Sequence, residues 1–283
     1  MLVNIEAWHN VLKKDTEVFT KLDNYLMKKI IGCHSKVPTE LLYLETSSVP
    51  IEYIIASRRI NYLHNILSKE DHELTKRVYI CQKKNPSKGD WCELVSSDLA
   101  MVGMDMSNDE ISKTSRVDFK SIVKKHVKAA AFSALKCVQT NHTKVKHIQY
   151  PQFRIQEYMT SSVFSTEEMS TLFNMRANTV NSFKMCFPSV FRNDTFCKLQ
   201  CPAAEDSISH TFKCSALNNS DPISNTSYEA IFSNVKQQKH AVERFITLQQ
   251  LRLSLLQSDD AYQGTVLDTC TPAGEAGERT RVL

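Results

Sequence analysis

The stretch "VDFKSIVKKHVKAAAFSALKCVQT", residues 117–140, is the most regular pattern in the chain and predicts the fold class. Its apolar residues recur at the three- and four-residue spacing that marks one side of a helix. They are Phe119, Ile122, Val123, Val127, Ala130, Ala134, Leu135 and Val138. Lys120, Lys124 and Lys128 follow one another at intervals of four on the other side. An amphipathic helix must bury its apolar side, so this stretch predicts packing against other helices.

Helical spacing continues on both sides of this stretch. It predicts further helices in segments 15–32, 49–69, 70–86, 88–103, 165–180 and 228–257. In the first of them the apolar positions are Val18, Phe19, Leu22, Leu26 and Ile30. Segment 39–46 is interpreted as helix or strand, and the proline-broken segment 144–158 is the best candidate for an extended crossing.

Local signals mark several predicted helix ends. Asp15 and Asp90 are expected as N-caps, Pro50 in a first turn, Gly32 and Gly103 just after a last turn, and Ser165 with Glu168 as a capping box. Only three of the six glycines precede residue 264, which disfavours hairpin-rich β folds. The sequence therefore predicts a mainly α protein.

Changes in composition suggest five regions. We expect a helical region over 1–110, a basic connector over 111–160, a helix with a Cys/His segment over 161–217, a linker and C-terminal helix over 218–263, and a disordered tail over 264–283.

Positive charge is concentrated in the middle of the chain. The net charge of the whole chain is +4, but residues 112–154 contain ten lysines and arginines and a single acid, Asp118, for a local charge of +9. Such a basic segment is suited to an anionic partner. The candidate phosphate contacts are Lys120, Lys124, Lys125, Lys128, Lys144, Lys146 and Arg154. The alternative is a solvated helix face without a ligand.

Several classes of protein are disfavoured by the sequence. Neither GxGxxG nor GxxxxGK[ST] occurs, so no nucleotide-binding fold is indicated by such motifs. No signal peptide or membrane-length apolar run is visible, and the nine cysteines are an odd number. These features predict an intracellular protein of the nucleus, the cytoplasm or both. No Ser/His/Asp or paired-carboxylate constellation indicates an enzyme.

Three cysteines and a histidine are clustered near the C-terminus. The spacing is Cys197-x3-Cys201-x8-His210-x3-Cys214. Three thiolates and one imidazole would complete a tetrahedral zinc site with no open position, so the site would be structural. Chance clustering remains an alternative because the other cysteines are scattered, and a reducing compartment disfavours a disulfide.

Several uncommon blocks resemble the C-terminal region of reverse transcriptases of non-LTR retrotransposons of the RTE and jockey type. They are "NIEAWHNVLKKD" (4–15), "LYLETSSVPIEYIIASRRINYLHNIL" (42–67), "VYICQKKNPSKGDW" (78–91), "TLFNMRANTVNSFKMCFPSVFRND" (171–194) and the Cys/His cluster, in the family's order. The cluster departs from the family pattern at Ile208-Ser209, where Gln-Glu is usual.

The resemblance implies a location and a role. This region follows the polymerase palm, so the chain would hold thumb-like helices, a basic connector and a zinc knuckle without catalytic aspartates. The pair Asp259-Asp260 lacks the aromatic residue that precedes the family's catalytic pair. The resemblance also implies that Arg58 and Arg59 contact a primer–template backbone. The alternative to this contact, for both arginines, is that the aliphatic part of the side chain packs on the fold while the guanidinium group faces solvent.

Two classes of function are therefore expected. The first is a non-catalytic region that binds template RNA or target DNA, with the missing palm as a further partner and a structural Zn²⁺ ion. The second is a helical protein-interaction module, or a co-opted transposon remnant, in which the knuckle only staples the fold. Tyr150, Phe153 and Tyr158 would stack on bases under the first hypothesis, or belong to the core.

Overall fold

The computed structural model describes residues 13–142, 145, 148–179, 210, 214, 231–232 and 234–258. Within these residues the chain is mainly helical and contains no strand, which confirms the predicted α class. The helices are α1 (Lys13–Ile31), α2 (Thr39–Thr46), α3 (Ile51–Leu67), α4 (Leu74–Lys84), α5 (Trp91–Met101), α6 (Asn108–Lys113), α7 (Arg116–Asn141), α8 (Glu157–Thr160), α9 (Thr166–Arg176) and α13 (Val235–Ser258). Among these helices, none has the length and apolarity that crossing a bilayer requires.

The chain forms two compact units. The first comprises Met1–Leu26, Leu42–Asn141 and Tyr150–Ile155, and the second comprises Met27–Leu41, His142–Gln149 and Gln156–Leu283. The five-region division expected from composition has different bounds and stays a prediction, and its tail, 264–283, lies outside the described residues.

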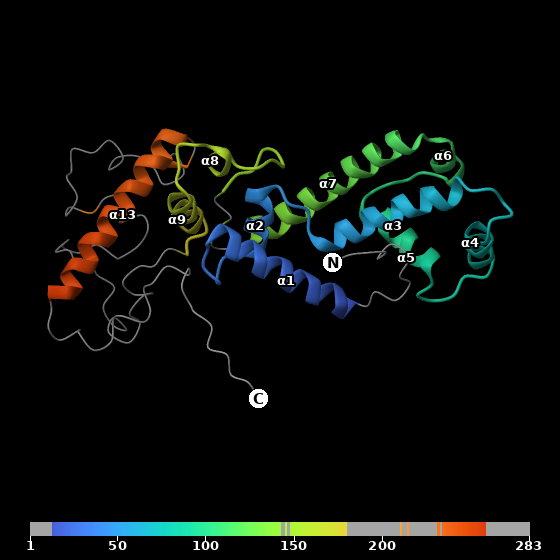
Figure 1. The fold of residues 1–283 in the computed structure, drawn as a ribbon, viewed down its shortest axis with the longest axis horizontal. Helices are drawn as coiled ribbons and strands as arrows, with labels where there is room; N and C mark the ends of the chain where they lie inside the picture. Colours follow the sequence, from blue (N-terminus) through green and yellow to red (C-terminus); the bar gives the residue numbers. More distant parts are fainter. Residues whose placement is uncertain are drawn as a thin grey trace, which may run out of the picture. The chain divides into compact units, whose positions relative to one another are not determined.

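The first unit is organised around α3, which packs against α4, α5, α6 and α7. Figure 1 shows α7 running beside α3. The core cluster includes Ala56, Ile60 and Leu63 of α3 and Trp91 and Val95 of α5, all less than 9% exposed. Burying a large apolar side chain contributes about 1.5–3 kcal/mol, so this cluster supplies much of the stability of the unit.

One narrow stripe of α7 faces this core. Its buried residues are Phe119, Val123, Val127, Ala131, Leu135 and Gln139, one in every four. Ile122 and Ala130 pack at the edge of the core as predicted, whereas Ala134 and Val138 are exposed. The predicted apolar side was therefore too wide in the C-terminal half, because only a single ridge of the helix meets a neighbour there.

His64 joins α3 to the start of α7. Its Nε2 atom lies 2.9 Å from the carbonyl oxygen of Thr114, and its ring stacks on Phe119 at a centroid distance of 4.7 Å. The tautomer protonated at Nε2 donates a hydrogen bond to that carbonyl. His64 thus positions the turn from which α7 begins.

The signals at the helix ends are mostly confirmed. Asp90 accepts the backbone N–H of Glu93 at 2.8 Å at the start of α5, and Gly32 and Gly103 adopt φ values of +70° and +65° after α1 and α5. Pro50 is the residue just before α3. The prediction for Asp15 was wrong, because α1 begins at Lys13 and includes Asp15. Segment 39–46 is the helix α2, and the described part of 144–158 contains no strand.

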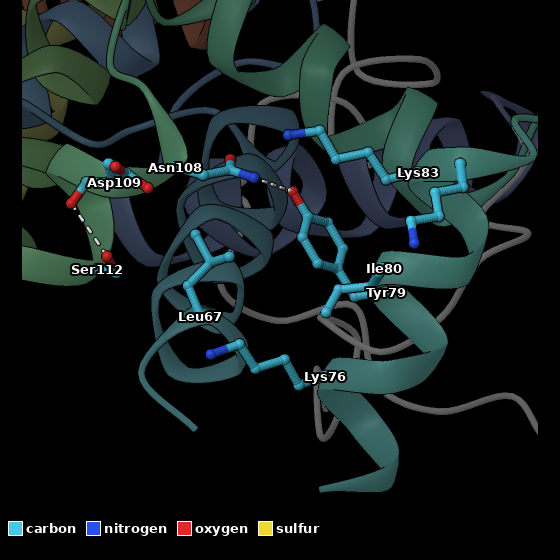
Figure 2. Close-up of a pocket in the computed structure, with 9 residues that line it drawn as sticks. Leu67, Lys76, Tyr79, Ile80, Lys83, Asn108, Asp109 and Ser112 are labelled. Atoms are coloured by element: carbon cyan, nitrogen blue, oxygen red, sulfur yellow. Dashed lines mark hydrogen bonds between the residues drawn. The ribbon is translucent and has the colours of Figure 1, made fainter. Parts of the chain in front are cut away.

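A groove separates α4 from α6 in the first unit (Figure 2). It has a volume of about 460 Å³. Its lining residues are Leu67, Lys76, Tyr79, Ile80, Lys83, Lys84, Asn108, Asp109 and Ser112. The Nδ2 atom of Asn108 donates to the hydroxyl of Tyr79 at 2.9 Å and ties the two helices together.

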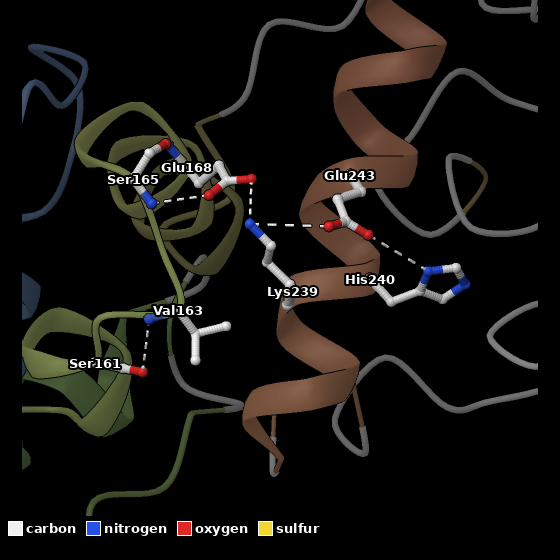
Figure 3. A network of polar contacts seen from close by, with 7 residues as sticks. All are labelled: Ser161, Val163, Ser165, Glu168, Lys239, His240 and Glu243. Carbon is white, nitrogen blue, oxygen red and sulfur yellow. Dashed lines mark hydrogen bonds and ion pairs between the residues drawn. The ribbon is translucent and has the colours of Figure 1, made fainter.

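In the second unit, α9 packs against α13. The capping box is confirmed, since the backbone N–H of Ser165 donates to Glu168 at 2.8 Å and the N–H of Glu168 donates back to the Ser165 hydroxyl at 3.2 Å. The other carboxylate oxygen of Glu168 binds Lys239 of α13 at 2.5 Å, as Figure 3 shows. The hydrogen bond from Lys239 is the main cause that lowers the pKa of Glu168. One carboxylate therefore caps α9 and anchors α13.

An ion pair is buried in the first unit. The Nε atom of Arg59 on α3 lies 3.3 Å from the Oδ2 atom of Asp98 on α5, and each side chain is about one-tenth exposed. The two atoms are not aligned for a hydrogen bond. Burial raises the pKa of the Asp98 carboxyl to about 6, although the Arg59 charge opposes the shift.

This raised pKa predicts a pH dependence of stability. Between the unfolded value near 3.8 and the folded value near 6, the native state holds a proton that the unfolded chain has lost. We therefore expect Asp98 to add about 1 kcal/mol to the unfolding free energy as the pH falls from 7 to 5. Urea unfolding of the wild type and of Asp98→Asn across this range measures the difference. Parallel pH profiles for the two proteins would contradict the assignment.

Candidate nucleic-acid interface and metal site

Four predicted phosphate contacts share the solvent face of α7. Lys120, Lys124, Lys125 and Lys128 are all exposed, and we call them the α7 lysine surface. The buried stripe that includes Phe119 sets the side from which the lysines project. Residues that are adjacent in sequence to the buried positions point to a different side of the helix. Residues four apart rise about 6 Å along an α-helix, so three of the lysines form a row about 12 Å long.

The charges of this surface are not neutralised by the described residues. The structure gives these lysines neither an ion pair nor a side-chain hydrogen bond within the parts of the chain that it describes. The nearest acid in sequence, Asp118, accepts the hydroxyl of Ser115 at 2.6 Å. Like charges four apart on a helix repel each other by about 0.2–0.5 kcal/mol, which a bound anion would relieve.

The two predicted arginines of α3 have different surroundings. Arg58 is exposed, whereas Arg59 is 8% exposed and paired with Asp98. Arg59 is thus not available to a phosphate, which corrects its assignment as a nucleic-acid contact. The alternative of an outward-facing guanidinium fails for Arg59 too, because its charge is held inside the fold by a carboxylate from another helix.

The other predicted contacts follow α7 in the sequence. Arg154 is exposed in the loop before α8, and Lys144 and Lys146 lie outside the described residues. Tyr150 and Tyr158 are 2% and 1% exposed, so they belong to the core and cannot stack on a base. Phe153 stacks on Phe132 of α7 at a centroid distance of 5.4 Å.

The Cys/His cluster is described only in part. Cys197 and Cys201 lie outside the described residues, Cys214 is fully buried and His210 is partly buried. No group of three or more His, Cys, Asp or Glu side chains that could hold a metal occurs within the described part of the chain. The set of three thiolates and one imidazole matches the donors that structural zinc takes, and the burial of Cys214 suits a closed site.

The α4–α6 groove has no signal in the sequence that predicts it. The basic pair Lys83-Lys84 is visible in "VYICQKKNP", but its distance from Asn108 and Asp109 depends on how α3 holds α4 and α6. A pair of lysines at the end of a helix is ordinarily explained by the helix dipole alone. Only the fold brings a second polar wall opposite them.

Comparisons with known proteins add no family. No protein-family model matches the chain, and no match is found among the curated proteins or the solved structures. The resemblance to retrotransposon reverse transcriptases therefore remains an expectation from the sequence.

The zinc hypothesis predicts a stoichiometric metal. Protein purified without chelators should contain about one zinc ion per chain, and Cys214→Ser should lose it because a thiolate ligand is removed. Cys137→Ser changes an exposed cysteine on α7 and serves as the matched control. Elemental analysis combined with thermal unfolding measures both effects. A metal-free wild-type protein that unfolds cooperatively would exclude the site.

Proposed function

We propose that this chain is a non-catalytic nucleic-acid-binding protein that binds RNA or DNA through the α7 lysine surface. The observation that carries the proposal is a row of exposed lysines, without neutralising partners among the described residues, on a helix whose other side is locked into the core. Arg58, Lys144, Lys146 and Arg154 are proposed as additional contacts.

A polyanion fits this surface better than a small anion does. A row about 12 Å long spans roughly three to four phosphates of one strand, since phosphates of B-form DNA rise 3.4 Å per strand. Each phosphate that a lysine neutralises releases condensed counterions, so binding gains entropy and weakens as salt is added. A rigid helix adds to this because its lysine stems start from fixed positions.

The resemblance supports a more specific version of the proposal. The chain would act as the region behind the palm of a non-LTR retrotransposon polymerase, inside the cell and in contact with that palm. Cys197, Cys201, His210 and Cys214 would bind one structural Zn²⁺ ion that stabilises the C-terminal segment. The chain would hold a template or target and leave the chemistry to the polymerase.

The salt dependence of RNA binding tests this proposal. A variant with Lys120, Lys124, Lys125 and Lys128 changed to glutamine should bind a single-stranded 20-mer RNA more weakly. The slope of log K against log salt should become shallower by about 3, because each lost phosphate contact contributes about 0.7. Fluorescence anisotropy at several salt concentrations gives both quantities.

The control changes Lys21, Lys36, Lys88 and Lys236 to glutamine, which removes the same charge from exposed positions outside α7. This control should keep most of the slope. Equal losses in the two variants would mean that net charge alone attracts the RNA, and an unchanged α7 variant would remove the proposal.

A second candidate function is favoured by α1. Val18, Leu22, Tyr25 and Leu26 are 62%, 37%, 58% and 47% exposed and lie at helical spacing, although the sequence suggested a buried face. Among the apolar positions predicted for this helix, Phe19 packs inward, against Ile51, Ile54 and Ile55. Such an apolar patch is typical of an interaction surface.

A second copy of the chain fits this face. In an antiparallel pair centred on Leu22, Val18 of one copy meets Leu26 of the other, and each Leu22 meets its counterpart. This self-complementary pattern is the property of a two-fold interface.

The second candidate predicts a weak dimer. A single pair of helices buries less area than the 1,200 Å² or more of a stable interface, so we expect self-association in the micromolar range or above. Sedimentation velocity should show dimers that Leu22→Asp abolishes. Val117→Asp, which changes an apolar residue of α7 that is 78% exposed, should leave them intact. A wild type that is monomeric throughout this range would exclude the candidate.

A further inference from the structure

The groove between α4 and α6 has two walls of different chemistry (Figure 2). The α4 wall carries Lys76, Lys83 and Lys84, and the α6 wall carries Asn108, Asp109 and Ser112. Leu67 and Ile80 add apolar surface between them. The volume of about 460 Å³ lies within the range of pockets that hold small organic ligands.

The available positive charge of the groove lies on Lys83 and Lys84. Lys76 is already paired, because its Nζ atom lies 2.8 Å from Asp71 and donates to the carbonyl oxygen of Lys69 at 2.6 Å. Lys83 and Lys84 are exposed, and the structure gives them no ion pair or side-chain hydrogen bond among the residues that it describes. Both lysines line the α4 wall, and an exposed ammonium group can bind a phosphate as a point charge.

The opposite wall presents acceptors and fixed donors. The Asn108 amide donates to the hydroxyl of Tyr79 at 2.9 Å, so the phenol keeps its own proton for another acceptor. The Ser112 hydroxyl donates to the carbonyl oxygen of Asp109 at 3.0 Å, and Asp109 is itself exposed and lines the groove. A carboxylate repels a phosphate and accepts hydrogen bonds from hydroxyl groups.

We propose that the α4–α6 groove binds a single ribonucleotide unit, with its phosphate on Lys83 and Lys84 and a ribose hydroxyl donating to Asp109. The sugar and base would cover the apolar surface of Leu67 and Ile80. The positive and the negative wall of the groove then both contact the ligand, because the ligand carries an anion at one end and hydroxyl donors at the other. The site is distinct from the α7 lysine surface and does not depend on nucleic-acid binding there.

The ribose contact gives the site a preference. A 2′-hydroxyl is the group that distinguishes RNA from DNA at a protein surface. A deoxyribonucleotide would leave Asp109 without that donor, and we expect it to bind about fivefold to tenfold more weakly. The same unit can be a free nucleotide or one residue of an RNA strand, since the groove contacts only one phosphate and one sugar.

The test uses the full chain with AMP, dAMP and a hexamer of riboadenylate, titrated by calorimetry. Lys83→Gln with Lys84→Gln should weaken binding about tenfold, and Asp109→Ala, which removes the acceptor, should abolish the preference for AMP over dAMP. Lys21→Gln with Lys236→Gln carries the same charge change at exposed positions outside the groove and α7, and it should leave AMP binding unchanged. Thermal unfolding confirms that each variant is folded.

The outcomes separate the two sources and the two proposals. A loss of AMP binding in the Lys83/Lys84 variant supports a site for the free nucleotide, and a loss seen only with the hexamer supports a site for one unit of a strand. Unchanged binding of both ligands in that variant overturns the inference. Failure of the α7 proposal shows instead as an unchanged hexamer affinity in a separate Lys124→Gln, Lys128→Gln variant.

Discussion

The packing of one stripe of α7 against α3 is the constraint on which the first unit depends. Phe119, Val123, Val127 and Ala131 are at most 5% exposed and occupy every fourth position, so the rotation of α7 about its axis is fixed. Burial of this stripe contributes several kcal/mol, at about 1.5–3 kcal/mol for each large side chain. Repulsion among the lysines on the other face costs a few tenths each and cannot rotate the helix. The packing of α7 in the core therefore keeps the α7 lysine surface exposed to solvent.

The packing around α3 also determines the shape of the α4–α6 groove. Because α3 packs against α4 and α6 as well as α7, it holds the two walls of the groove at a set separation. The hydrogen bond between Asn108 and Tyr79 adds a direct link across it. His64 holds the junction that follows α6 through Thr114 and Phe119. The positively charged surfaces of α4 and α7 are therefore parts of one helical scaffold built on α3.

Features that depend on neighbouring residues could be predicted from the sequence. The capping box of Ser165 and Glu168, the N-cap at Asp90 and the glycines after α1 and α5 each follow from local backbone chemistry. The lysines of α7 could be predicted too, because helical periodicity sets the side on which they lie. Asp15 was assigned wrongly since a good capping residue can also sit within a first turn.

Features that depend on distant residues could not be predicted. Whether the apolar positions of α1 are buried depends on which elements pack against them, and helical periodicity alone does not predict those neighbours. The same holds for the groove, whose walls come from segments that are separate in the sequence. For the zinc ligands, the spacing defines a donor set, but convergence on one ion depends on the path of the chain between Cys201 and His210.

Arg58 and Arg59 show why residue type alone does not assign a role. The two are adjacent, yet α3 turns one to solvent and the other to Asp98 in the interior. An exposed guanidinium keeps its hydration and can exchange it for a phosphate at small cost. A buried one has lost that hydration, and removing it from its carboxylate would leave two uncompensated charges. Arg59 is therefore part of the contact between α3 and α5. A ligand can bind only to the basic side chains that face solvent.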